Sequence, residues 1–182
     1  MTKRVLGILG SPRRGGNTEI LLDEALRGAA EAGAETAKIA LTDLQIGPCR
    51  GCDWCEGTHI CIQEDDMVGL RRQMDASDVW VLGTPVYWWG PTAQFKTFLD
   101  RWYAGPKSLF QGRRIVLIIP LGDSDPQTAR HTVGMFEDAL DYVEAERFAV
   151  VVAPGVNARG EVRQHPDLLE AAYRAGQEAV TR

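Results

Sequence analysis

Short apolar runs alternate with segments of helical period along most of the chain. Residues 4–10 form a largely apolar run that stops at Ser11-Pro12, which is typical of a strand buried on both faces of a parallel sheet. From Pro91 onward, aromatic and leucine side chains recur every three or four residues as far as Tyr103, which predicts an amphipathic helix opened by proline. By the same criteria, strands are expected at 4–10, 35–41, 78–86, 114–121 and 147–153, and helices at 17–32, 65–74, 91–104, 128–143 and 168–180.

This alternation predicts the fold class. Strands that follow helices in turn require a parallel sheet with helices on both faces and right-handed crossovers. We therefore expect an α/β protein with a doubly wound, five-stranded parallel sheet of order 2-1-3-4-5. Ligands of such sheets bind outside the carboxyl ends of the strands, so every strand-to-helix loop, including the cysteine-rich one, is expected at that edge. The chain shows no internal repeat or linker, which predicts a single domain over 1–182 with a cysteine-rich insert at about 47–63.

Composition and charge narrow the class of protein. The 182 residues are 45% hydrophobic and 25% charged, which is ordinary for a globular protein and argues against disorder. The net charge of −5 argues against nucleic-acid binding, which usually needs a basic stripe. No apolar run reaches about 18 residues, so no membrane span is expected. The apolar start is interrupted at residues 11–14 (Ser-Pro-Arg-Arg), which is too early for the apolar region of a signal peptide. We therefore expect a cytoplasmic protein.

The first strand-to-helix loop has the features of a phosphate site. Residues 10–18 read Gly-Ser-Pro-Arg-Arg-Gly-Gly-Asn-Thr, directly before a predicted helix whose N-terminal N–H groups attract an anion. Ser11, Asn17 and Thr18 offer side-chain donors, and Arg13 offers positive charge. The loop lacks both the Gly-Lys-Ser/Thr ending and a Gly-x-Gly-x-x-Gly pattern, so it favours a single phosphate monoester. The alternative is an ordinary glycine-rich turn in which Asn17 caps the helix.

The third strand-to-helix loop is aromatic. Tyr87, Trp88 and Trp89 follow one another, and flat aromatic faces stack on flat rings. Main-chain groups at 86–90 offer hydrogen bonds to the edge of a heterocycle. Because three consecutive aromatic side chains hardly face one ligand together, we assign Tyr87 and Trp88 to a ligand and Trp89 to the core or a dimer interface.

The four cysteines all lie between Cys49 and Cys61, with the spacing Cys-x2-Cys-x2-Cys-x5-Cys. A compact Cys-x2-Cys-x2-Cys run offers three thiolates to one iron–sulfur cubane, and five intervening residues let Cys61 reach its fourth corner. The run therefore predicts a [4Fe–4S] cluster on Cys49, Cys52, Cys55 and Cys61. Zinc is a rival, although four-cysteine zinc sites usually pair two knuckles across a longer loop. A cysteine loop without metal is the other alternative.

Two pairs of charged residues are expected to have structural roles and no catalytic one. Lys96 and Arg101 are expected on the solvated face of the helix that begins at Pro91, and Asp65-Asp66 is expected to start a helix.

The sequence carries three motifs of a known family, namely Gly-Ser-Pro-Arg-Arg-Gly-Gly-Asn-Thr-Glu at 10–19, Thr-Pro-Val-Tyr-Trp-Trp-Gly-Pro-Thr-Ala-Gln-Phe-Lys-Thr-Phe-Leu-Asp-Arg at 84–101, and Pro-Cys-Arg-Gly-Cys-Asp-Trp-Cys at 48–55. With these motifs, the chain resembles the flavodoxin-like NAD(P)H-dependent FMN reductases over about residues 3–125. With Cys61 added, it most resembles their iron–sulfur flavoprotein branch.

The resemblance implies a flavodoxin-like fold, FMN as cofactor, and a homodimer or homotetramer with flavin near a subunit interface. It implies that Ser11, Arg13, Asn17 and Thr18 lie on the FMN phosphate, that Pro85, Val86, Tyr87 and Trp88 lie along the isoalloxazine, and that Gly122 or Asp123 is nearby.

Two functions remain in competition. The first is an FMN-dependent redox protein that moves electrons between a reduced donor and an acceptor through FMN and a [4Fe–4S] cluster. The second is a cluster-free NAD(P)H-dependent reductase of FMN or quinones, in which hydride reaches the flavin without a catalytic side chain. A pure electron carrier is a variant of the first. A receiver domain or a low-molecular-weight phosphatase is disfavoured, because Gly10-Ser11 stands where the first needs carboxylates and no cysteine precedes Cys49.

Overall fold

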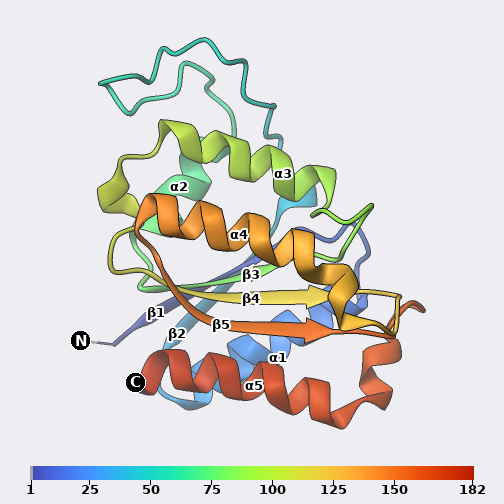
Figure 1. Ribbon diagram of the computed structural model, residues 1–182. Coiled ribbons are helices and arrows are strands. Elements are labelled where there is room, and N and C mark those ends of the chain that lie inside the picture. The colour runs from blue at the N-terminus through green and yellow to red at the C-terminus, as the bar shows by residue number, and fades with distance from the viewer. Residues whose placement is uncertain (1) are drawn as a thin grey trace.

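All five strands of the sheet run parallel (Figure 1). The computed structural model describes residues 2–182, and its strand order β2-β1-β3-β4-β5 confirms the predicted order. The strands are β1 Arg4–Leu9, β2 Glu35–Ala40, β3 Val79–Gly83, β4 Arg114–Pro120 and β5 Glu146–Ala153. The helices are α1 Asn17–Glu31, α2 Met67–Asp75, α3 Ala93–Asp100, α4 Arg130–Val143 and α5 Pro166–Thr181.

Helices cover both faces of the sheet, as predicted. In Figure 1, α1 and α5 lie on one face, and α2, α3 and α4 lie on the other. The central strand β3 serves both layers, since Trp80 and Leu82 belong to the core under α3 and α4, whereas Val79 and Val81 belong to the core over α1 and α5. Alternate side chains of a strand point to opposite faces, so a strand buried on both sides must be apolar at every position.

Helices α1 and α5 cross at two glycines. A Cβ added to Gly28 would overlap the carbonyl oxygen of Tyr173, and one added to Gly176 would overlap that of Ala25. The backbones of the two helices therefore approach more closely than any larger residue permits.

The third helix begins later than predicted. Thr92, not Pro91, marks its start, because the Thr92 hydroxyl accepts a hydrogen bond from the Phe95 N–H at 3.2 Å and so caps α3. The helix ends at Asp100 and continues as a 3₁₀ turn over Arg101–Ala104. In the described part of the chain, no helix has the length and apolar character needed to cross a membrane.

Candidate functional site

The N-terminus of α1 is open to an anion. Gly16 occupies the capping position, and no side chain accepts a hydrogen bond from the first turn. The backbone N–H groups of Asn17 and Thr18 belong to that turn, where no helical carbonyl reaches them. These N–H groups carry the positive end of the helix dipole, so the arrangement suits a phosphate.

A cavity of about 100 Å³ lies directly beside this helix end. Four of the five strand-to-helix loops predicted to meet at the carboxyl edge contribute to it, namely those after β1, β3, β4 and β5. Most of the flavin-site residues expected from the sequence line it, namely Ser11, Arg13, Asn17, Thr18, Pro85, Val86, Tyr87 and Gly122. Trp88 and Asp123 do not line it. Val156 and Asn157 do; neither residue was predicted from the sequence, although their loop was expected at this edge.

The side chain of Asn17 is fully engaged within the protein. Its amide N–H groups donate to the carbonyl oxygens of Val156 at 3.1 Å and Ala158 at 2.9 Å, and its oxygen accepts from the N–H of Val162 at 3.1 Å. The sequence suggested a helix cap or a phosphate contact for this amide. The structure instead uses it to join the first loop to the loop after β5, which leaves the backbone N–H of Asn17 for an anion.

Two buried threonines tie the third loop to the first. The Thr92 hydroxyl donates to the carbonyl oxygen of Gly10 at 2.6 Å, and the Thr92 N–H donates to the hydroxyl of Thr84 at 3.1 Å. The N–H of Val86 donates to the carbonyl oxygen of Pro120 at 3.2 Å. The cavity therefore has a wall that is fixed by hydrogen bonds before any ligand binds.

Beyond Val86, the third loop forms a tight two-residue turn. The main chains of Tyr87 and Gly90 exchange hydrogen bonds of 2.8 and 3.0 Å around Trp88 and Trp89, whose φ angles are 49° and 60°. Turns of this kind favour glycine or asparagine, and a left-handed residue with a Cβ costs about 1–2 kcal/mol. Trp88 is 91% exposed and Trp89 is half-exposed. Of the two expected positions for Trp89, the core of its own chain is therefore wrong, and a dimer interface stays a prediction.

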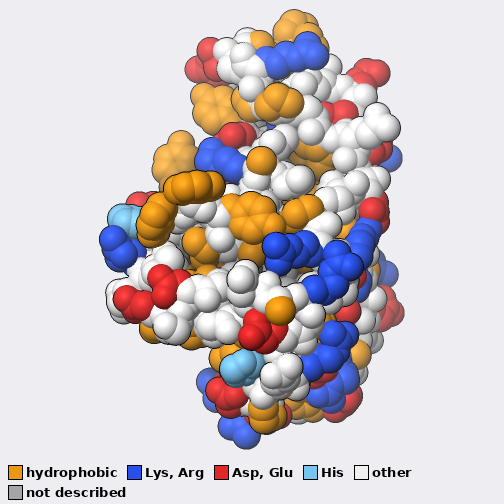
Figure 2. Space-filling model, turned by 90° about the vertical axis from the view of Figure 1, so that its right-hand side faces the viewer, with side chains coloured by type: hydrophobic (Ala, Val, Ile, Leu, Met, Phe, Trp, Pro, Cys, Tyr) orange, Lys and Arg blue, Asp and Glu red, His pale blue; other side chains and the backbone are white. Residues whose placement is uncertain are grey.

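Figure 2 looks onto the carboxyl edge and shows hydrophobic side chains concentrated on its upper half, with charged side chains dominating below. The exposed large hydrophobic residues of the chain fall mostly in two segments, the aromatic loop and the cysteine loop, and they include Tyr87, Trp88, Trp89, Trp54, Ile60 and Ile62. An exposed apolar surface of this kind marks a binding face.

Asp123 is held within its own loop. Its carboxylate accepts hydrogen bonds from the Asp125 N–H at 3.0 Å and from the Thr128 hydroxyl at 2.7 Å. These bonds, the Asp125 N–H first, lower the pKa of Asp123 below its ordinary value.

The four cysteines line one small cavity. Burial raises the pKa of the Cys55 thiol, and electrostatic repulsion from the neighbouring Cys61, Cys49 and Cys52 raises it further, as expected for sulfurs gathered in one place. In the part of the chain that the structure describes, no three Cys, His, Asp or Glu side chains converge on a single point as one ion requires. A cubane cluster offers a separate iron to each thiolate, so its ligands surround a volume rather than a point.

The cysteine loop does not lie where we expected. It leaves the carboxyl edge after β2 but folds back over the outer side of α3, as Figure 1 shows. Its cavity is shared with Asp100, Arg101 and Tyr103, at the end of α3 opposite to Thr92. The expectation that the cysteines share an edge with the flavin cavity is therefore wrong.

Arg101 holds the cysteine loop against the end of α3. Its side chain is 1% exposed, so the expectation of a solvated face is also wrong. The guanidinium pairs with the carboxylate of Asp65 through Nη1 at 2.5 Å and Nη2 at 3.1 Å. Asp65 lies just before α2 and accepts the Met67 N–H at 3.1 Å, so it helps to start that helix while it fixes the loop to the end of α3.

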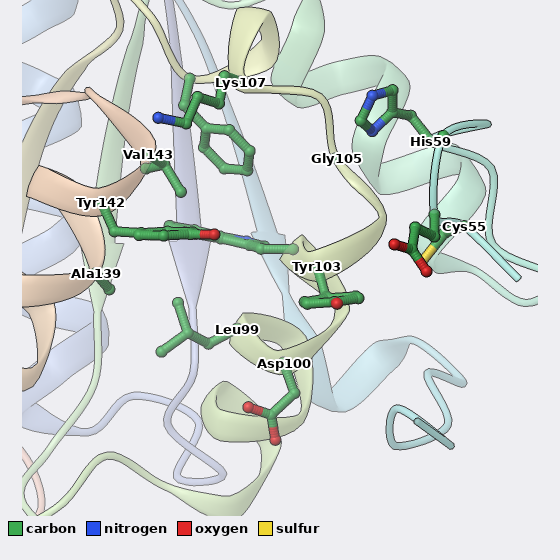
Figure 3. Close-up of a pocket in the computed structure, with 14 residues that line it drawn as sticks. Cys55, His59, Leu99, Asp100, Tyr103, Gly105, Lys107, Ala139, Tyr142 and Val143 are labelled. Atoms are coloured by element: carbon green, nitrogen blue, oxygen red, sulfur yellow. The ribbon is translucent and has the colours of Figure 1, made fainter. Parts of the chain in front are cut away.

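A larger cavity of about 470 Å³ adjoins the cysteine loop. Figure 3 shows Leu99 of α3 and Tyr142 of α4 reaching toward it, with Cys55 and His59 on the side of the cysteine loop. This cavity gives a small molecule room to approach the Cys55 side of the loop.

Comparison with known proteins identifies the family. The pattern described as "NADPH-dependent FMN reductase" matches residues 3–158. The chain belongs to the NADPH-dependent FMN reductase family.

Relatives within this family confirm the resemblance to the iron–sulfur flavoprotein branch. An "Iron-sulfur flavoprotein" of Archaeoglobus fulgidus is 43% identical over 98 residues, which are 54% of this chain and 44% of that protein. An iron-sulfur flavoprotein of Methanocaldococcus jannaschii is 44% identical over 98 residues, 54% of this chain and 51% of that protein. The chain thus spans about half the length of the curated relatives it matches.

Solved structures show the fold over the whole chain. The "NAD(P)H:quinone oxidoreductase from Methanothermobacter marburgensis" aligns with a TM-score of 0.76 at 18% identity, and the alignment covers 98% of this chain and 97% of that one. The sheet order and this likeness confirm the flavodoxin-like fold predicted from the sequence.

Proposed function

We propose that this member of the FMN reductase family is a redox protein that moves electrons between a reduced donor and an acceptor through FMN and a [4Fe–4S] cluster. The observation that carries the proposal is that one chain gathers two separate sets of residues, each of the kind that holds a redox cofactor. A cavity at the uncapped N-terminus of α1 collects the predicted flavin residues, and a second cavity collects all four cysteines. We further propose that 1–182 forms a single domain.

The residues of the first cavity fit FMN rather than a dinucleotide. The N–H groups of Asn17 and Thr18 would hold the phosphate, with Ser11 and the positively charged Arg13 beside them. The guanidinium of Arg13 donates to the carbonyl oxygen of Asn157 at 3.1 Å, which holds it at the rim. One phosphate-sized helix end suits a mononucleotide.

The isoalloxazine would lie along Pro85, Val86 and Tyr87, whose backbone is fixed to β4. Gly122 faces the same cavity, and the exposed Trp88 stands beyond it. When bound, FMN accepts a hydride or two electrons and releases them singly. No side chain that lines the cavity is assigned as an acid or base.

The residues of the second cavity fit an iron–sulfur cluster. All four thiols line one space, and the buried Arg101 guanidinium donates to the Cys61 sulfur at 3.4 Å. A buried N–H of Arg101, that of Nε, has no acceptor among the described residues. A cationic donor beside thiolates suits a group of net negative charge. The cluster would supply one-electron chemistry.

The length of α3 separates the two cavities within one chain. Thr92 at its start bonds to the first loop, and Asp100 at its end lines the cysteine cavity. Eight residues at 1.5 Å each give about 12 Å along the helix. The proposal includes a homodimer or homotetramer in which the exposed aromatic loop meets a second subunit and the cysteine loop comes nearer to the partner's flavin. NAD(P)H is a proposed donor, and a cytoplasmic location remains part of the proposal.

A second candidate is a cluster-free NAD(P)H-dependent reductase of FMN or quinones. An "FMN-dependent NADH:quinone oxidoreductase" of Gluconacetobacter diazotrophicus is 31% identical over 127 residues, 62% of each chain. None of the cysteines lines the cavity at the end of α1, so this function would need none of them.

The visible spectrum of anaerobically purified protein separates the two. The two-cofactor protein should show a broad shoulder beneath the flavin bands that dithionite bleaches, and flavin bands alone would favour the second candidate. Flavin released by heat should co-migrate with FMN on chromatography, and recovery of FAD would contradict the single-phosphate site.

A further inference from the structure

Arg101 holds the cysteine loop at both ends. Its Nη1 donates to the carbonyl oxygen of Gly47 at 2.8 Å, just before the first cysteine, and its guanidinium pairs with Asp65, just after the last. The same carboxylate accepts the N–H of Gly47 at 3.0 Å. We name this pair, together with the backbone of Gly47 that it grips, the Arg101–Asp65 clasp. It closes the base of the loop that carries the cysteines.

The clasp also reaches a sulfur. Nη2 of Arg101 donates to Sγ of Cys61 at 3.4 Å. The Nε–H is buried and has no acceptor among the residues that the structure describes. An arginine presents five N–H donors, and leaving a buried donor without an acceptor costs free energy. The unpaired Nε–H therefore indicates that an acceptor outside the protein completes this site. Arg101 therefore brings positive charge to the wall of the cysteine cavity, and its Nε–H is a spare donor.

We propose that Arg101 is a positioning residue that also raises the reduction potential of the cluster held by the cysteine loop. The inference rests on the function proposed above. Reduction adds one electron from an external reductant without forming or breaking a bond, so the reduced form carries one more negative charge. A fixed cation that donates to a ligand sulfur stabilises that form. Net charge and hydrogen bonds to sulfur are known determinants of cluster potential.

Opposite changes to the clasp should shift the potential in opposite directions. Arg101→Gln removes the cation and leaves the Asp65 carboxylate, which should lower the potential. Asp65→Asn removes the anion and leaves the Arg101 charge without its partner, which should raise it. A residue that only held the loop in place would not give shifts of opposite sign.

The chain offers a matched control at Arg71 and a double variant that avoids leaving a buried charge without its partner. Arg71 also grips the loop, through hydrogen bonds to the carbonyl oxygens of His59 at 2.7 Å and Ala104 at 3.0 Å, but it donates to no sulfur. Arg71→Gln should leave the potential unchanged. Because breaking one partner of a buried pair destabilises more than replacing both, the double variant Asp65→Asn with Arg101→Gln keeps the test open if Arg101→Gln does not fold.

The experiment reconstitutes each protein anaerobically with iron and sulfide, counts iron and FMN per chain, and titrates the cluster potentiometrically by electron paramagnetic resonance. At equal cluster content, Arg101→Gln should shift the ratio of reduced to oxidised cluster at a fixed potential by about tenfold, or about 59 mV downward for one electron. The double variant should shift in the same direction by less.

Each outcome is decisive. Wild-type protein that takes up no cluster would overturn the proposed function, and this inference with it. If the wild-type protein loads a cluster, the potentials of wild type and Arg101→Gln are compared, with the double variant used if Arg101→Gln does not fold. Equal potentials would overturn the inference alone. A shift in Arg71→Gln as large as that in Arg101→Gln would also overturn it, since loop anchoring alone would then explain the effect.

Discussion

Replacing Asn17 with alanine should destabilise the protein even when no ligand is present. The amide makes three hydrogen bonds to backbone groups more than 100 positions away, at Val156, Ala158 and Val162. A hydrogen bond of this kind contributes about 1 kcal/mol, and groups left unpaired in a buried site add to the loss. We therefore expect Asn17→Ala to lower the free energy of unfolding by about 3 kcal/mol.

The assay is urea and thermal unfolding of flavin-free protein, followed by titration with FMN. At about 2–4 °C per kcal/mol for a chain of this size, the melting temperature should fall by about 6–12 °C. FMN should bind more weakly as well, because the first loop loses its tie to the loop after β5. Ser11→Ala serves as the control for stability, since among the described residues its hydroxyl has one hydrogen bond, of 3.2 Å from the Arg13 N–H within the same loop. Unchanged stability of flavin-free Asn17→Ala, with a loss confined to FMN affinity, would show that the Asn17 amide does not hold the two loops together.

Three further predictions follow from the packing and charges. Gly176→Ala should lower the free energy of unfolding by about 1–3 kcal/mol, because the added Cβ would overlap the backbone of α1. Gly134→Ala is the control: its Cβ meets open space, so the free energy should change by no more than about 1 kcal/mol in thermal unfolding. Burial acts to raise the pKa of Asp65, but Arg101 and the Gly47 N–H lower it below its ordinary value. The clasp should therefore stabilise the protein fully above about pH 4 and lose its effect as acid protonates Asp65. Urea titrations at acid pH compare wild type with Asp65→Asn, and an equally steep loss of stability in both would argue against this. Cys52→Ala should keep FMN bound while electron transfer to a one-electron acceptor falls, and undiminished transfer in a stopped-flow assay would remove the cluster from the path.

The sequence predicted the sheet because its signals are local. Each strand is a short apolar run and each helix an apolar stripe, and the alternation admits few topologies. The flavin-site residues came together for the same reason, since the carboxyl ends of parallel strands share one edge. Val156 and Asn157 were missed because their loop matches no phosphate-binding or flavin-binding motif, and only its place after β5 brings it to the cavity.

The position of the cysteine loop depended on a contact between distant residues. Asp65 and Arg101 lie 36 positions apart, and neither has a local pattern that marks it as a partner of the other. Arg101 was assigned to the outer face by continuing the helical period of α3. The helix ends at Asp100, and the tighter 3₁₀ turn that follows changes the direction of the side chains, which carries Arg101 inward.

The side chain of Asn17 shows the same limit. An asparagine at the start of a helix predicts a cap, yet Gly16 holds that position and Asn17 is buried. Its partners come from the last strand-to-helix loop, so only the assembled sheet reveals them.

The content of iron, sulfide and flavin in protein reconstituted without oxygen tests whether one chain holds both cofactors. We expect about four iron, four sulfide and one FMN per chain, with the iron largely lost and the FMN retained in Cys52→Ala. One FMN with no sulfide, or a single zinc in place of the iron, would contradict this expectation.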